Sequence, residues 1–169
     1  MFILDSRVMS TGNSPQINLE TIRTPCIGVC STGIGDSVCR GCKRFSHEVI
    51  DWNGYTQEEK RFVDKRLSGF LSQACALKCT VTDRELLKWQ LDTQQVRYAA
   101  DHDEYCWLFQ LLRAGAGQIK DASKYGFRVH GEWADLTLLQ LRDQIDEDFW
   151  VLSTAHYDRY LPTPDLFTG

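Results

Sequence analysis

Four of the seven cysteines lie close together in the sequence and could bind one metal ion. Cys26, Cys30, Cys39 and Cys42 follow the pattern C-x3-C-x8-C-x2-C within 17 residues. The stretch is rich in glycine, so it buries little apolar surface to offset the roughly 1–2 kcal/mol of entropy that each fixed residue loses. Thiolates on a structural metal could contribute on the order of 10 kcal/mol. The spacing therefore predicts one centre bound by all four cysteines, rather than four unrelated buried cysteines.

The second cysteine pair has the spacing of a metal-binding turn. Two residues between Cys39 and Cys42 allow both sulfurs to face one centre, and we expect Gly41 to adopt the positive φ that such a turn requires. Four cysteine ligands suit both tetrahedral Zn2+ and an iron–sulfur cluster, and the spacing favours neither. Three cationic side chains would partly offset the negative charge of the thiolates. They are Arg40, Lys43 and Arg44.

Further motifs flank the cysteines. They are T-P-C-I-G-V-C at 24–30, C-R-G-C-K-R at 39–44, E-V-I-D-W at 48–52, and Thr56 with Glu59. Together, over about residues 23–68, they resemble the bacterial domain-of-unknown-function family 1289, whose pattern is roughly S/T-P-C-I-x-x-C, C-x-G-C-x-R, E-I/V-x-x-W and S-x-x-E. Members are generally described as predicted iron–sulfur proteins of unknown function. The resemblance therefore implies an iron–sulfur centre at the same four cysteines, and it implies no activity.

The chain departs from the family pattern at two places. Phe45 stands where the family usually has threonine, and Ser31 with Thr32 stands where it often has a Leu-Asp pair. Neither departure affects an expected ligand.

The remaining cysteines could form a second site. Cys75 and Cys79 are four residues apart at the end of an expected helix, where such residues share a face. With Cys106, and with His102 or His47, they could hold a second centre or form a redox pair. Buried cysteines more often serve as small core hydrophobes. We expect the core role and keep the second site as an alternative.

Other clusters also have both a functional and a structural interpretation. The Asp, His, Asp and Glu of 101–104 are interpreted as an acidic helix start rather than as metal ligands. The acids of 143–148 predict an exposed helix face that could meet a basic partner. Several aromatic side chains could stack on nucleic-acid bases, although most should belong to the core. They are Trp52, Tyr55, Trp89, Trp107, Trp133 and Trp150.

Composition excludes several classes of protein. The 169 residues are 43% hydrophobic and 25% charged, which is typical of a globular chain. No stretch approaches the roughly 18 apolar residues of a membrane span, and residues 1–20 lack an export signal, so we expect a cytoplasmic protein with no membrane association. Phosphate-binding loops and common hydrolase motifs are missing from the sequence. This favours a non-catalytic role and leaves an enzymatic one open.

Hydrophobic spacing predicts the elements that must position these residues. Residues 1–21 should form a mobile tail, and Thr56 with Glu59 should form a capping box that starts a helix over about 57–73. Three later helices are expected. The first should begin after Thr82 or Asp83, the second should span about 105–112, and the third should follow Thr137. A helical turn is expected over 119–125 and an extended stretch over 127–133.

The sequence therefore predicts a mainly α protein, in which a small irregular four-cysteine metal-binding module with one helix (22–73) is followed by a helical C-terminal region (80–169). We expect a non-catalytic metal-centre protein, holding an iron–sulfur cluster or Zn2+, that acts as an interaction or regulatory module with another protein as its partner. One alternative is an iron–sulfur protein of electron transfer or redox sensing. A less favoured alternative is a zinc-stabilised nucleic-acid-binding protein, since the 22–70 segment has a net charge of only +2.

Overall fold

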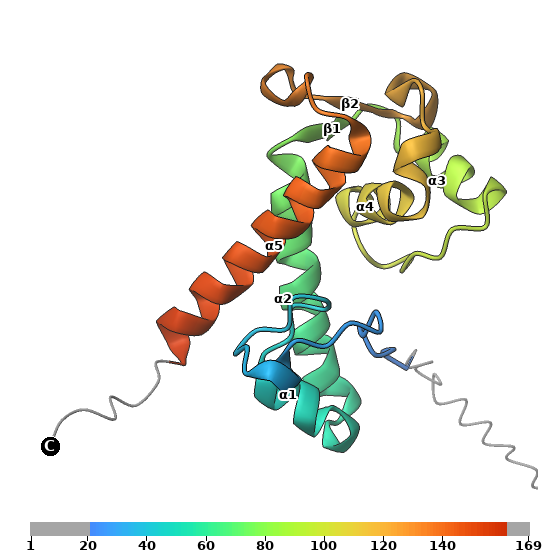
Figure 1. Cartoon of the computed structure of the whole chain (residues 1–169). Coiled ribbons are helices and arrows are strands. Elements are labelled where there is room, and N and C mark those ends of the chain that lie inside the picture. Colours follow the sequence, from blue (N-terminus) through green and yellow to red (C-terminus); the bar gives the residue numbers. More distant parts are fainter. Residues whose placement is uncertain (1–20, 162–169) are drawn as a thin grey trace, which may run out of the picture.

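The structure, a computed structural model, describes residues 21–161, and this part of the chain is mainly α-helical, as predicted (Figure 1). The tail expected at 1–21 lies outside the described residues except for Thr21. Within 21–161, no helix has the length and apolar character needed to cross a membrane. The helices and strands, in chain order, are α1 (Ser46–Asp51), α2 (Gln57–Ala76), β1 (Cys79–Val81), α3 (Arg84–Thr93), α4 (Glu104–Gly115), β2 (Phe127–Val129) and α5 (Leu138–Tyr160).

Capping boxes start the two longest helices, α2 and α5. The N–H of Glu59 donates to the Thr56 hydroxyl at 3.2 Å, and the N–H of Thr56 donates to the Glu59 carboxylate at 2.7 Å. Thr137 and Gln140 form the same reciprocal pair before α5. These bonds satisfy N–H groups that have no partner inside the helix. The helix predicted over 57–73 is confirmed, and it continues to Ala76.

Aspartates cap the two shorter helices of the C-terminal region. Asp83, rather than Thr82, accepts a hydrogen bond from the N–H of Leu86 and begins α3. Asp103 accepts from two N–H groups and begins α4, which confirms the acidic helix start expected at 101–104. The helical turn expected before Gly126 is present at Ala122–Tyr125.

The core lies where α2, α4 and α5 meet. α2 packs against both α4 and α5, and Figure 1 shows the two long helices crossing the molecule together. One buried cluster joins Trp52, which precedes α2, to apolar side chains of all three helices. α2 therefore belongs both to the cysteine segment and to the core of the C-terminal region. The most deeply buried large apolar side chains are Trp107, Phe127, Leu87, Leu91, Leu108, Leu111, Leu112, Leu141 and Ile145.

A two-stranded antiparallel sheet lies at one end of the helices. Gly126, just before β2, has a φ of 78°, and a Cβ there would lie 2.3 Å from the carbonyl oxygen of Asp83. Glycine is therefore required where the chain returns past the start of α3. The extended stretch predicted over 127–133 ends at Val129, because Gly131–Trp133 forms a 3-10 turn, and β1 was not predicted. The paired residues are Cys79↔Val129, Thr80↔Arg128 and Val81↔Phe127.

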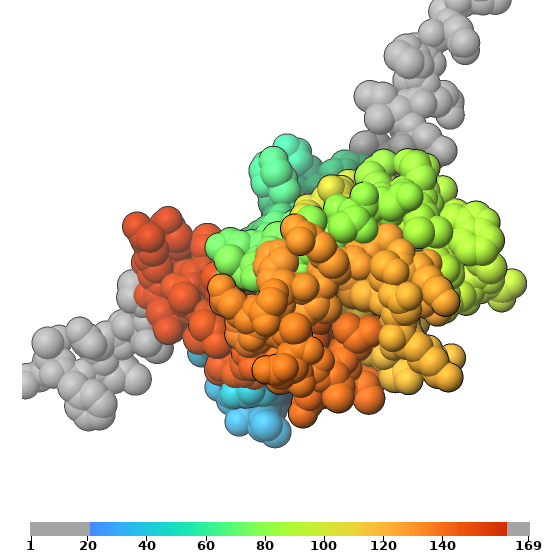
Figure 2. Space-filling model, turned by 90° about the horizontal axis from the view of Figure 1, so that it is seen from above, coloured from blue at the N-terminus to red at the C-terminus, as the bar shows by residue number. Residues whose placement is uncertain are grey.

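The surface above the sheet is formed mainly by the connection between α4 and α5. Figure 2 shows this orange segment in the middle of the view, with α3 in yellow-green on one side and α5 in red on the other. The segment covers the end of the core at which α2 ends and α5 begins, away from the four-cysteine loop.

The acidic stretch of α5 faces basic side chains of the same chain. Lys43 is 1% exposed and its ammonium pairs with Asp146, while Lys78 is 2% exposed and pairs with Asp148. The sequence predicted an exposed acidic face that could meet a basic partner, and two of its acids instead pair with lysines of the same chain. Two lysines from distant segments pair with them, because α5 packs beside the regions that carry both lysines.

We expect the stability of the protein to depend on pH through His102. Its Nε2 lies 2.8 Å from Oδ2 of Asp64 in α2, and this hydrogen bond raises the pKa of His102 above 6.5. The folded state then binds the proton more tightly than the unfolded chain, so the stabilisation is complete below the unfolded value and is lost as pH rises through the raised pKa. Asp64→Asn should flatten this pH dependence in urea unfolding. Identical pH profiles for the two proteins would contradict it.

Candidate metal centre

Two segments of the N-terminal loop lie against each other and bring the two cysteine pairs into one region. A Cβ on Gly41 would lie 2.2 Å from the carbonyl oxygen of Val29 and 3.2 Å from Cγ1 of Ile27. Only glycine allows the segments to approach so closely. The N–H of Arg40 also donates to Oγ of Ser31 at 2.9 Å. The segment that follows Cys26 is therefore packed on the turn between the second pair.

The turn differs from the prediction in which residue adopts a positive φ. We expected Gly41 to do so, whereas Lys43, directly after the turn, has a φ of 61°. The Lys43 N–H donates to the Cys39 carbonyl at 2.8 Å, and the Cys39 N–H donates to the Arg44 carbonyl at 2.9 Å. These backbone bonds close the turn. Gly41 is required for the close approach of the neighbouring segment and not for its φ.

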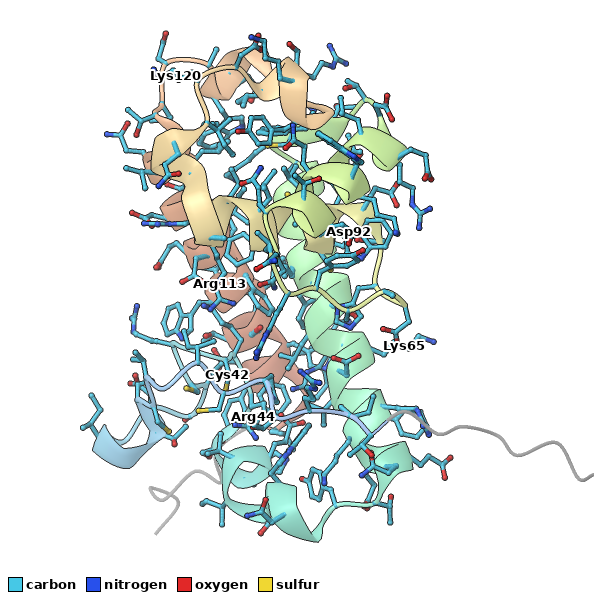
Figure 3. The ribbon with its side chains drawn as sticks, turned by 90° about the vertical axis from the view of Figure 1, so that its right-hand side faces the viewer. Cys42, Arg44, Lys65, Asp92, Arg113 and Lys120 are labelled. Carbon is cyan, nitrogen blue, oxygen red and sulfur yellow. The ribbon has the colours of Figure 1, made fainter. Side chains whose placement is uncertain are left out.

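Cys39 and Cys42 are both buried in this turn, at 1% and 6% exposed. Burial alone would raise the pKa of Cys39, but hydrogen bonds from the backbone N–H groups of Cys42, Ser31 and Gly41 lower this pKa from 9.0 to about 7. The pKa of Cys42 is raised, chiefly by burial, although Nε of Arg44 donates to its sulfur at 3.2 Å and opposes the shift. Figure 3 shows Cys42 and Arg44 in this loop, close to other sulfur atoms. The turn thus favours a thiolate at Cys39 and places a cation beside Cys42.

Cys26 and Cys30 are exposed. The N–H of Gly28, which has a φ of 88°, donates to Sγ of Cys26 at 3.4 Å, and Sγ of Cys30 lies 3.1 Å from Oγ1 of Thr32. Among residues 21–161, no three His, Cys, Asp or Glu side chains are gathered closely enough to hold a metal ion. The structure therefore brings the two cysteine pairs onto adjacent segments, and it does not gather the four thiols into one coordination shell.

The donor set of the loop fits a thiolate-binding metal. Cys39 and Cys42 lie in one closed turn, and backbone N–H groups stabilise the thiolate of Cys39. Cys26 and Cys30 lie on the segment packed against that turn, and their exposed side chains meet no packed core that would prevent them from turning toward it. Cysteine sulfurs are the ligands of structural Zn2+ and of iron–sulfur clusters. The chemistry of the site suits either cofactor.

A buried ion pair anchors this loop on α2. Nη1 and Nη2 of Arg66 donate to the two carboxylate oxygens of Glu48, each at 2.6 Å. The same carboxylate accepts from the N–H of Phe45 at 2.9 Å and so caps α1. Glu48 is only 5% exposed, so without Arg66 its carboxylate would be a desolvated charge. Sequence reasoning did not identify this pair, although Glu48 belongs to the E-V-I-D-W motif.

Cationic side chains lie over aromatic rings next to the ion pair. The guanidinium carbon of Arg44 lies 4.8 Å from the ring centre of Trp52, and that of Arg66 lies 4.0 Å from the ring centre of Phe45. Contacts of this kind contribute roughly 0.5–2 kcal/mol each. Phe45, which stands where the family pattern usually has threonine, is thus buried and packs against the guanidinium of Arg66.

The three other cysteines lie in the hydrophobic core, which fits the core role expected for them. Cys75 and Cys79 are fully buried, and the hydrogen bond to Cys79 is the main reason that the pKa of Cys75 is raised. Cys106 donates to the Ser68 carbonyl at 3.2 Å, and burial raises its pKa well above the usual value. Of the two histidines considered with them, His102 pairs with Asp64, and His47 lies beside the Phe45 ring.

Most aromatic side chains that could stack on bases are used within the fold. Trp52 and Trp107 are buried in the core. Trp150 and Trp133 each lie beneath a cationic side chain, at 3.9 and 4.2 Å from the ring centre. Trp89, on α3, is 58% exposed. This distribution matches the expectation that most of them belong to the core.

A comparison with family models identifies the segment that carries these features. Residues 24–70 match the family DUF1289. Its description is "Protein of unknown function (DUF1289)", and the match confirms the resemblance seen in the motifs. The DUF1289 segment, residues 24–70, contains the four cysteines, the Glu48–Arg66 ion pair and Trp52. No curated protein and no solved structure matches the chain.

Gly41→Ala should destabilise the DUF1289 segment. The added methyl group would meet the Val29 carbonyl, and overpacking of this kind costs roughly 1–3 kcal/mol. Gly33→Ala is the matched control, because nothing lies within 4 Å of a Cβ at that position and its φ is not positive. Urea unfolding of the two variants measures the difference. Equal stabilities would show that the two segments are not packed as described.

Trp52→Ala should lower the free energy of unfolding by about 3–5 kcal/mol, because the indole joins the loop to the core and supports Arg44. Trp89→Ala, at an exposed position, is the control and should change it little. Denaturant titration measures both. If the Trp52 variant is as stable as the parent but fails to retain a partner in a pull-down, Trp52 is an interaction residue instead.

Proposed function

We propose that the protein is a non-catalytic, cytoplasmic metal-centre protein in which Cys26, Cys30, Cys39 and Cys42 bind one zinc ion or iron–sulfur cluster. In this proposal the metal-bound DUF1289 segment is an interaction or regulatory module, and its partner is another protein. The observation that carries the proposal is the close approach at Gly41, which places the segment of the first cysteine pair directly on the turn of the second.

The loop that carries the four cysteines has little regular secondary structure. Between residues 21 and 45 the structure contains one short 3-10 turn, Thr32–Ile34, and a single bridge between Val38 and Phe45. Within residues 21–37 only Ser31 is buried, so this part of the loop has little apolar burial to offset its backbone entropy. Four thiolates that share one metal would cross-link its two halves. Binding would then be coupled to the ordering of the loop.

Exposure of one cysteine pair favours a second candidate function, redox sensing or electron transfer by an iron–sulfur cluster. Cys26 and Cys30 are both exposed, whereas Cys39 and Cys42 are buried. A cluster held between the two pairs would lie near the surface, and solvent exposure is one of the factors that sets cluster potential. An anaerobic absorption spectrum with metal analysis of freshly purified protein separates this candidate from structural zinc. A visible band that bleaches reversibly on reduction indicates the redox role.

Cys26→Ser and Cys39→Ser should each lower the bound metal sharply, because a missing ligand opens the coordination shell. The exposed Cys26 is the better test, since its replacement disturbs no packing. Cys106→Ala, outside the loop, should keep the metal content of the parent. Elemental analysis of the three variants gives the result. Full metal content in both serine variants would exclude this site, and a loss only in the Cys106 variant would place the metal in the core cluster.

A further inference from the structure

The turn of the proposed centre is attached directly to α5. The ammonium of Lys43 pairs with Asp146, and the guanidinium of Arg40 lies 3.9 Å from the ring centre of Trp150 and 3.9 Å from the carboxylate of Glu147. Nε1 of Trp150 donates to the carbonyl of the buried Val38 at 3.4 Å. Residues 146–150 of the helix therefore contact the residues that surround Cys39 and Cys42.

The position of Lys43 depends on the geometry of the turn. Lys43 directly follows Cys42, has a φ of 61°, and donates from Nζ to the Gly41 carbonyl at 3.3 Å. Its side chain is 1% exposed, so the charge is stabilised only while the turn keeps it next to Asp146. If the turn loosens, the buried ammonium of Lys43 can regain water without Asp146, whose side chain is already 47% exposed.

The contacts of α5 change along its length. Leu141, Ile145 and Phe149 are buried in the core with α2 and α4, whereas none of residues 154–161 is buried. In the last turns, the Phe45 ring of the cysteine segment lies 5.2 Å from that of Tyr157 and 6.1 Å from that of His156, and the Phe70 ring of α2 lies 5.3 Å from that of His156. Docking of residues 146–160 therefore depends on the cysteine segment in addition to α2, whereas the start of the helix is held by the core.

We propose that metal occupancy of the cysteine loop controls the docking of the C-terminal half of α5, residues 146–160, so that this half-helix transmits the state of the centre to the rest of the molecule. This inference rests on the proposed function. When the four thiolates bind one metal, the turn keeps Lys43, Arg40 and Val38 in position to contact the helix. A loosened turn releases all three contacts and leaves the half-helix held by Phe149, by Lys78 and by α2, so that it undocks more readily. By linkage, docking of the helix must raise metal affinity by the same factor.

Hydrogen exchange with mass spectrometry tests the coupling on the full chain. We compare protein purified with its bound zinc or iron to the same protein stripped by a chelator under anaerobic conditions, and to Cys26→Ser. Couplings of this kind are typically 5- to 150-fold, so exchange in 146–160 should rise by at least about fivefold on metal loss, while 138–145 changes little. Unchanged exchange in 146–160, with faster exchange in 24–45, would overturn the proposal.

Asp146→Asn removes the partner of Lys43 and should give fast exchange in 146–160 even with metal bound, together with weaker metal binding in a chelator competition. Asp143→Asn is the matched control, because Asp143 is exposed and, among residues 21–161, pairs with its neighbour Arg142 alone. Arg40→Gln, at an exposed position, provides a milder second test. If metal affinity and exchange in both Asp146→Asn and Arg40→Gln equal those of Asp143→Asn, the contacts do not couple the helix to the centre. A parent that binds no metal fails the proposed function itself, a result distinct from either of these.

Discussion

The buried carboxylate of Glu48 is the point on which the N-terminal half of the molecule depends. It accepts two hydrogen bonds from Arg66 and one from the backbone of Phe45, so one side chain joins the end of the cysteine loop, the start of α1 and the middle of α2. Because Glu48 is buried, the loss of Arg66 would leave a carboxylate whose burial costs several kcal/mol. The stacking of Arg44 on Trp52 and of Arg66 on Phe45 both require that α1 keep this position.

Charge in this protein is balanced between segments rather than within them. The 22–70 segment is slightly basic and the region after residue 80 is acidic, which from the sequence suggested an external partner for the acids. Two lysines of the same chain, Lys43 and Lys78, neutralise part of this acidic charge. Each is almost completely buried against an aspartate of α5. The charge asymmetry therefore contributes to the attachment of α5, and it is a weaker indication of nucleic-acid or protein binding than the sequence alone implied.

The structural features that could be predicted from the sequence are local. Those that could not be predicted depend on contacts between segments far apart in the chain. The helix starts at Thr56 and Thr137 follow from capping boxes whose two members are three residues apart. The four cysteines were recognisable from their spacing, and their segment matches a known family. The packing of Val29 on Gly41, however, joins two loop segments that no local sequence pattern relates. The positive φ was assigned to Gly41 on residue type and belongs to Lys43. β1 was missed because a three-residue strand has no periodicity of its own and forms only by pairing with β2.

That pairing has a consequence for how the chain reaches its structure. Val81 pairs with Phe127, so all of α3 and α4 lies inside the loop that the sheet closes. Helices form from neighbouring residues on a microsecond timescale, whereas a contact between distant residues must first overcome the entropy of closing the intervening loop. During synthesis, β1 leaves the ribosome long before β2 exists. Until β2 emerges, the backbone groups of Cys79–Val81 have no strand partner, so the sheet can form only after α3 and α4 have been synthesised.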